Sequence, residues 1–218
     1  MTDDDAPGTI LVLPGGGYQH LSAKEGEPVA AWLRSLGWNA RVVAYPIRAR
    51  HPEPLNFLRA QIEGERAAGA PLVGVLGFSA GGHLAGHAAF APDSTPEQRP
   101  DLAVLCYPVV TMLGTTHEGS RINLLGEGAD HDARAATSLE RLVSADAPPV
   151  FLWHTVVDEA VLVAEHAYAL ATALAAHAIP HELHTFTEGE HGVAMREDIP
   201  ARQWMALCAT WLAGFAAR

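Results

Sequence analysis

The sequence has few cysteines, few basic residues and no long apolar run. Its 218 residues include only Cys106 and Cys208, and both stand in apolar segments, which favours two buried thiols over a disulfide framework. Lysine and arginine number 14 against 25 aspartates and glutamates, so the net charge is -11 with histidine neutral. A chain of this charge repels polyanions. We therefore expect neither nucleic acid nor membrane among its partners, and the sequence leaves its oligomeric state open.

The N-terminal segment lacks the basic stretch followed by an apolar stretch that marks a secretory signal. Residues 1–8 instead form an acidic tail that begins Met-Thr-Asp-Asp-Asp. We predict a cytoplasmic protein. The alternative is a secreted protein whose signal peptide preceded Met1 and has been removed. The length and a hydrophobic content of 49% predict a single domain over residues 1–218.

Short apolar runs alternate with amphipathic segments along the chain, which predicts an α/β fold with a mostly parallel sheet and helices on both faces. Residues 109–149 are harder to interpret, with one helical turn and one helix expected. We expect this irregular connection to lie near the active site, because long connections at this level of such sheets often cover the ligand. Strands are expected at residues 9–13, 39–45, 72–76, 102–107, 150–154 and 181–186, and helices at 28–36, 55–69, 133–143, 160–178 and from 200 onward.

A serine stands between two glycines at the point where an apolar run changes into a helical pattern. Leu72 to Leu76 predict a buried strand, Gly77-Phe-Ser79-Ala-Gly81 follow, and the next residues are rich in alanine and leucine. This is the order of a nucleophile elbow, whose strained turn holds a serine hydroxyl above the end of a sheet. We predict that Ser79 is a nucleophile.

A glycine-rich turn follows the first predicted strand. Pro14 precedes Gly15, Gly16 and Gly17, and such a run leaves backbone N–H groups uncovered by side chains. Groups of this kind can stabilise an oxyanion. We predict an oxyanion hole made by the N–H of Ala80 with those of Gly16 and Gly17, and the alternative is a merely flexible turn.

A serine hydroxyl needs a base that takes its proton as it attacks. Of the 12 histidines, His191 follows the last predicted strand between flanking glycines, and we expect most of the others to lie at the surface. Asp158 follows the preceding strand and is the predicted third member. Its alternative role is that of a helix N-cap, and Glu159 is the rival acid. The order Ser79, Asp158, His191 is that of the α/β hydrolases.

The chain carries a series of short motifs in a specific order. They are Pro14-Gly-Gly-Gly-Tyr18, Gly77-Phe-Ser-Ala-Gly-Gly-His83-Leu-Ala85, Tyr107-Pro108-Val109, Asn123-Leu-Leu-Gly126, Pro149-Val-Phe-Leu-Trp-His-Thr155, Asp158-Glu-Ala-Val161 and His191-Gly192. Together they resemble the acetylxylan-esterase-like branch of small carbohydrate esterases within the α/β-hydrolase superfamily. The resemblance implies that fold, with about six strands. Because only eight residues precede Thr9, the first two strands of the full fold are expected to be absent.

The resemblance implies a serine esterase that hydrolyses short-chain esters through an acyl-enzyme, above all O-acetyl groups on xylo-oligosaccharides or other sugars. It implies neither a cofactor nor a metal. Tyr18, Tyr107 and Val193 are candidates to line the substrate pocket, with structural packing as the alternative for each. His83 and His87 have the spacing of two metal ligands on a helix, but no acidic third ligand stands near them.

Other functions fit the same residues. A general carboxylesterase or a small serine peptidase would use the same three side chains, because a serine triad also cleaves amides. A protein that kept the hydrolase fold only to bind a ligand is a third possibility, and the complete set of Ser79, Asp158 and His191 argues against it. No motif indicates the acyl length, the sugar or the position of the ester.

Overall fold

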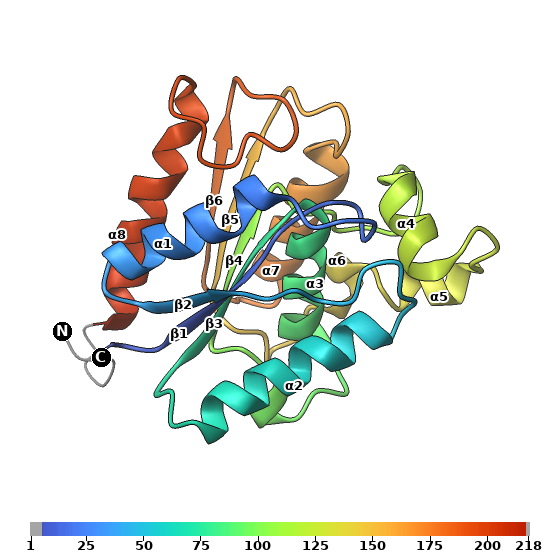
Figure 1. Cartoon of the computed structure of the whole chain (residues 1–218). Helices are drawn as coiled ribbons and strands as arrows, with labels where there is room; N and C mark the ends of the chain where they lie inside the picture. The colour runs from blue at the N-terminus through green and yellow to red at the C-terminus, as the bar shows by residue number, and fades with distance from the viewer. Residues whose placement is uncertain (1–5, 217–218) are drawn as a thin grey trace.

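One sheet of six parallel strands organises the described part of the chain (Figure 1). The structure, a computed structural model, describes residues 6–216, so most of the predicted acidic tail lies outside the described residues. The strands follow the order β2-β1-β3-β4-β5-β6, and each neighbouring pair is parallel. They are β1 (Thr9–Leu13), β2 (Asn39–Val42), β3 (Val73–Phe78), β4 (Leu102–Cys106), β5 (Val150–Thr155) and β6 (His181–Phe186).

Helices cover both faces of this sheet, as predicted. Among the described helices, none is long and apolar enough to cross a membrane. The helices are α1 (Glu27–Ser35), α2 (Glu53–Ala67), α3 (Ser79–Phe90), α4 (Glu118–Leu125), α5 (His131–Ala135), α6 (Leu139–Leu142), α7 (Ala169–Ala176) and α8 (Trp204–Ala216).

The alternation of side chains along each strand produces two hydrophobic cores. In β1, Ile10 and Val12 belong to the core on the side of α1 and α8, whereas Leu11 and Leu13 belong to the core on the side of α2, α3, α6 and α7. Successive side chains of a strand point to opposite faces, so a strand covered on both sides is apolar throughout. All five residues of β1 are buried accordingly. Figure 1 shows α1 and α8 on one side of the sheet and α3, α6 and α7 on the other.

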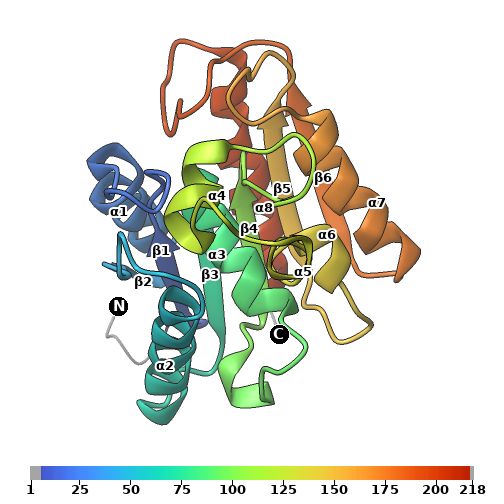
Figure 2. The ribbon, with the colours of Figure 1, turned by 90° about the vertical axis from the view of Figure 1, so that its right-hand side faces the viewer.

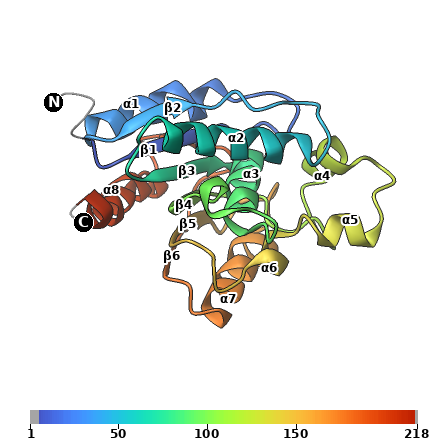
Figure 3. The ribbon, with the colours of Figure 1, turned by 90° about the horizontal axis from the view of Figure 1, so that it is seen from below.

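The connection over residues 109–149 contains short helices, α4, α5 and α6. The sequence predicts one helix over residues 133–143, but α5 ends at Ala135 and α6 begins at Leu139. The Ser138 hydroxyl donates to the Arg134 carbonyl and accepts the Met112 N–H, and such side-chain hydrogen bonds compete with a continuous helix. Figure 3 places α4 and α5 at the end of the molecule opposite α8, and in Figure 2 they lie in front of the sheet.

The helix predicted over residues 160–178 also begins later than expected. A π-helical turn at Ala164–Tyr168 leads into α7, and residues 159–163 are irregular. Asp158 explains this start, because its side chain accepts the N–H groups of Ala160 and Val161 at 2.9 Å. This turn fixes the carboxylate at the carboxyl end of β5, the edge of the sheet where parallel α/β folds bind their ligands.

Candidate active site

The turn between β3 and α3 holds Ser79 in a left-handed backbone conformation, with φ of 51°. A non-glycine residue reaches this region only where its surroundings enforce it. The flanking glycines permit the close packing: a Cβ on Gly77 would lie 2.2 Å from the Gly81 carbonyl oxygen, and one on Gly81 would lie 2.2 Å from the Leu13 carbonyl oxygen. Both positions therefore exclude every larger residue, as the elbow pattern predicts.

The structure brings the three predicted residues into one hydrogen-bonded chain. His191 Nε2 lies 2.7 Å from Ser79 Oγ, and His191 Nδ1 lies 2.6 Å from Asp158 Oδ2. An ionised carboxylate can only accept, so Nδ1 carries the ring proton and Nε2 presents its lone pair to the hydroxyl. Ser79 follows β3, Asp158 follows β5 and His191 follows β6, so three strand ends meet here.

Asp158 is buried, at 3% exposure. Burial raises the pKa of its carboxyl, but hydrogen bonds from His154 and His191 outweigh that effect and hold the pKa below its usual range. His154 Nε2 lies 3.3 Å from Asp158 Oδ2, and the N–H groups of Ala160 and Val161 bind Oδ1. The carboxylate is therefore charged and fixed in place at neutral pH.

In the glycine turn after β1, the N–H groups of Gly16 and Gly17 point away from the carbonyl groups that form the hydrogen bonds of the turn. The Gly15 carbonyl accepts the Ser22 N–H at 3.0 Å, and the Gly16 carbonyl accepts the Gln19 N–H at 2.9 Å. Because C=O and N–H point in opposite directions across a trans peptide, the N–H groups of Gly16 and Gly17 face the other way. Neither has an acceptor among the described residues.

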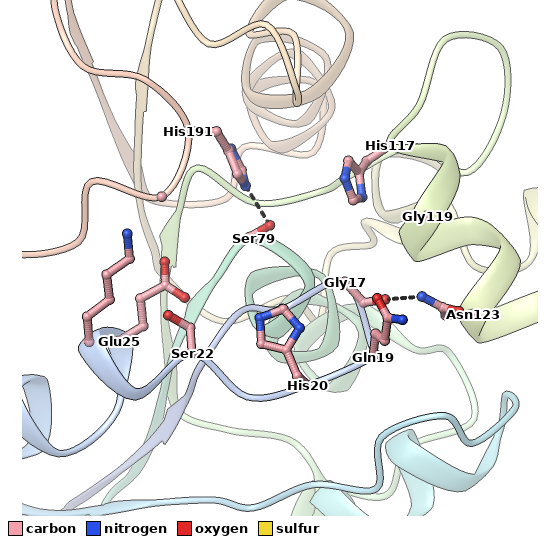
Figure 4. Close-up of a pocket in the computed structure, with 13 residues that line it drawn as sticks. Gly17, Gln19, His20, Ser22, Glu25, Ser79, His117, Gly119, Asn123 and His191 are labelled. Carbon is pink, nitrogen blue, oxygen red and sulfur yellow. Dashed lines mark hydrogen bonds between the residues drawn. The ribbon is translucent and has the colours of Figure 1, made fainter.

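These N–H groups border a pocket of about 290 Å³ in front of Ser79 (Figure 4). Ala80, the second residue of α3, also has an N–H without an acceptor in its own helix, because the first turn of a helix leaves its donors free. Apart from four glycines, every residue that lines the pocket has a side chain that can form hydrogen bonds. The lining residues are Gly16, Gly17, Gln19, His20, Ser22, Lys24, Glu25, Ser79, His117, Gly119, Asn123, His191 and Gly192.

Three side chains predicted to line this pocket lie elsewhere in the described structure. Tyr18 is fully buried, and its hydroxyl lies 2.7 Å from His83 Nδ1. Tyr107 is 1% exposed and packs edge-on to the His191 ring, with centroids 5.1 Å apart. Val193 is buried beside a neighbouring pocket. The structure thus supports the alternative role, structural packing, for each of the three side chains. They lie under the loops that carry the site rather than on the surface of the pocket.

Glu25 is a buried member of the site that the sequence analysis missed. Its Oε2 accepts the Gly15 N–H at 2.9 Å, and its Oε1 accepts the Tyr107 hydroxyl at 2.6 Å. The Tyr107 oxygen in turn accepts the Ala194 N–H at 3.0 Å. This carboxylate joins the glycine turn to the loop of His191. An acid in a short polar stretch before a helix is typical of a surface position, so no sequence pattern distinguishes Glu25 from a surface residue.

No sequence pattern indicates a role for His117, and Asn123 is singled out only because it belongs to a motif of the family resemblance. Both belong to the start and body of α4, and both line the pocket. Asn123 Nδ2 donates to the Gly17 carbonyl at 2.9 Å. The motif Asn123-Leu-Leu-Gly126 was the available signal. Through this contact Asn123, within the connection over residues 109–149, touches the glycine turn.

The helical pair His83 and His87 does not present a metal site. Both ring nitrogens of His83 have partners, since Nδ1 binds the Tyr18 hydroxyl and Nε2 binds the Thr137 carbonyl, each at 2.7 Å. Burial lowers the pKa of His83 to about 4. Within residues 6–216, no group of three or more His, Cys, Asp or Glu side chains could hold a metal ion.

The sequence pattern of the prolyl oligopeptidase family matches residues 56–217, a span that contains Ser79, Asp158 and His191. The chain belongs to the prolyl oligopeptidase family. A solved structure at 38% identity, the acetyl ester-xyloside bifunctional hydrolase of Caldicellulosiruptor lactoaceticus, covers 95% of this chain and 82% of its own, with a TM-score of 0.88. An α/β hydrolase from a deep-sea metagenome is 27% identical over the whole chain and 88% of its own, with a TM-score of 0.77. The predicted α/β-hydrolase fold is confirmed.

Two curated relatives are matched over a smaller share of their own length. The endo-1,4-beta-xylanase B of Butyrivibrio fibrisolvens is 35% identical over 90% of this chain and 34% of its own length. The acetylxylan esterase of Xylanibacter ruminicola is 34% identical over 57% of this chain and 28% of its own length. The chain thus spans about a third of the curated relatives that it matches. These names confirm the predicted resemblance to the acetylxylan-esterase-like branch.

Proposed function

We propose that this chain is a serine esterase that removes short acyl groups, above all O-acetyl groups of xylo-oligosaccharides or other sugars. The observation that carries the proposal is the hydrogen-bonded chain from Asp158 through His191 to Ser79, which opens into a pocket rich in polar groups. Nucleophile, base and orienting acid are the parts that acyl transfer requires.

In the first half of the reaction His191 Nε2 takes the proton of Ser79 as Oγ bonds to the ester carbonyl carbon. The carbonyl oxygen becomes an oxyanion, and the N–H groups of Gly16, Gly17 and Ala80 are the proposed donors to it. In other enzymes the loss of one such donor costs about 3 to 4 kcal/mol. The bond to the sugar oxygen then breaks, and that oxygen takes the proton from His191.

The second half regenerates the enzyme. His191 takes a proton from water, the water oxygen attacks the acyl carbon on Ser79, and the acid leaves as Ser79 recovers its proton. Asp158 keeps the proton on His191 Nδ1 throughout and stabilises the imidazolium that forms in each half. Its fixed charge suits this role, because it holds the ring in one tautomer and one orientation.

The pocket and the relatives both support a sugar as the alcohol part of the ester. Gln19, His20, Ser22 and Asn123 line the pocket with groups that donate to or accept from hydroxyls. The relatives named above include an acetylxylan esterase and an acetyl ester-xyloside hydrolase. The xylanase name belongs to a protein of which this chain matches only a third, so it supports a sugar substrate without supporting glycosidic cleavage here. A cytoplasmic location stays a prediction.

Acetate release from acetylated xylo-oligosaccharides tests the proposal, measured beside 4-nitrophenyl acetate and a proline-containing peptide amide. We expect release from both esters and little from the amide. Ser79→Ala should abolish turnover of both esters, while Ser35→Ala, at an exposed position of α1, should leave it unchanged. Turnover of the aryl ester alone would favour a general carboxylesterase, and turnover of the amide would favour a peptidase. A folded chain that cleaves none of the three would contradict the proposal.

A further inference from the structure

His117 stands at the entrance of α4 and lines the pocket from the side opposite the His191 loop (Figure 4). It is the N-cap residue of that helix, and its side chain accepts the Ser120 N–H. A Cβ placed on Gly17 would lie 3.7 Å from His117 Cε1. The ring therefore borders the same space as Ser79 and the glycine turn, although the mechanism above gives it no task.

Its hydrogen bonds fix which nitrogen carries the proton. His117 Nδ1 lies 3.2 Å from the Ser120 N and 2.8 Å from the Ser120 hydroxyl oxygen. A backbone N–H can only donate, so Nδ1 must be the unprotonated nitrogen. Burial and the nearby His191 lower the pKa of His117, which keeps the ring neutral. The remaining proton is thus on Nε2, and this N–H has no acceptor among the described residues.

The position of the ring suits the alcohol side of the ester. The rings of His117 and His191 are nearly parallel, at 17°, with centroids 6.5 Å apart, and Ser79 lies between them in Figure 4. The leaving oxygen must reach His191 Nε2 to take its proton. The alcohol part of the substrate is then held beside His191, and His117 is the ring that faces it.

We propose that His117 Nε2–H donates a hydrogen bond to a hydroxyl oxygen of the sugar next to the ester, and so selects sugar esters over simple esters. This inference rests on the proposed function and adds a binding residue to it. A fixed donor favours an acceptor oxygen at one place, and a ligand that lacks this oxygen leaves the N–H without a partner.

The test is the variant His117→Asn. Asparagine is a strong N-cap residue, so its side chain can still accept the Ser120 N–H, but it is too short to replace Nε2–H in the pocket. We expect kcat/KM on acetylated xylo-oligosaccharide to fall about five- to twentyfold, mainly through KM. With 4-nitrophenyl acetate the value should stay within about twofold. His131→Asn, at an exposed position of α5, is the matched control.

The outcomes separate this inference from the proposed function. If the wild-type chain releases no acetate from the sugar, the proposed function fails and the inference falls with it. If the wild type acts on the sugar and His117→Asn loses equally on both esters, or loses on neither, the inference alone is wrong. In the Ser79→Ala variant, nitrogen NMR should show the His117 proton on Nε2, and its signal should shift when the acetylated sugar is added. An unshifted signal would contradict the inference.

Discussion

The two walls of the pocket are built in different ways. The inner wall, formed by Gly16, Gly17, Ser79 and His191, consists of loops that leave the ends of β1, β3 and β6. Its positions follow from the sheet and from close backbone contacts at the elbow. The outer wall is formed by His117, Gly119 and Asn123 at the start and in the body of α4.

Side chains and loop contacts, rather than a sheet, hold the outer wall. The Arg50 guanidinium donates to the carbonyl oxygens of Ile122 and Asn123, and the His51 N–H donates to the Leu124 carbonyl. Hydrogen bonds of this kind are each worth about 1 kcal/mol net. We therefore expect the acyl-transfer chemistry to depend on the inner wall and the choice of substrate to depend on the outer wall.

The largest effect should come from removing the charge behind the inner wall. Asp158→Asn would turn an acceptor of the His191 Nδ1 proton into a group that also donates, which favours the wrong tautomer. We expect kcat on 4-nitrophenyl acetate to fall about 10³- to 10⁴-fold. Steady-state kinetics measure this, with Asp146→Asn at an exposed position as the control. A loss below tenfold would mean that Asp158 does not orient His191.

The second effect concerns the backbone contact behind the elbow. In Gly81→Ala the new Cβ would meet the carbonyl oxygens of Leu13 and Pro14 at 2.2 and 2.4 Å, so β1 and α3 must move apart. We expect the free energy of unfolding to fall by about 1 to 3 kcal/mol or more, together with the activity. Urea unfolding checks this. Gly64→Ala has open space around it in α2 and should instead stabilise the chain by about 0.5 to 1 kcal/mol.

The inner wall could be predicted from the sequence because each of its parts is a local pattern at a strand end. Ser79 stands between glycines that permit one tight turn, Asp158 follows an apolar run, and His191 follows the last predicted strand between flanking glycines. The parallel topology then places successive strand ends at one edge. The local patterns and the sheet topology together predict the contact between Ser79 and His191, which lie 112 positions apart in the chain.

Buried polar side chains could not be predicted in this way. Most histidines were expected at the surface, but His83, His87, His154 and His166 are all buried. Two of them have partners on distant segments: His83 lies between the Tyr18 hydroxyl and the Thr137 carbonyl, and His166 accepts the Val110 N–H. The sequence around a polar residue in an apolar stretch does not show whether its side chain will have a hydrogen-bond partner, because tertiary packing alone brings that partner into contact.

A pH dependence should follow from His83, which joins the glycine turn to the connection over residues 109–149. His83 binds Tyr18 of the glycine turn and Thr137 of the connection. Its pKa is about 4 in the folded chain, against about 6.5 when unfolded. Below pH 6.5 the unfolded chain therefore binds a proton that the folded chain does not. The free energy of unfolding should therefore decrease as the pH is lowered from about 6.5 to about 4. His83 should contribute roughly 1.4 kcal/mol to this decrease per pH unit.

Urea unfolding between pH 7 and pH 4.5 measures this slope. His83→Gln is expected to be less stable at every pH, because it loses its fit in the core, but its stability should depend less steeply on pH. His177→Gln, at an exposed position after α7, is the matched control. Equal slopes in the wild type and in His83→Gln would show that another group carries the pH dependence.

The smallest effect should come from the contact between the two walls. Asn123→Ala removes the Nδ2 donor to the Gly17 carbonyl, so water must take its place at this partly exposed site. We expect kcat/KM on 4-nitrophenyl acetate to fall about three- to tenfold, equivalent to roughly 1 kcal/mol, with Asn56→Ala on the exposed side of α2 as the control. A loss of a hundredfold or more would mean that α4 fixes the conformation of the glycine turn, so that the geometry of the inner wall depends on the outer wall.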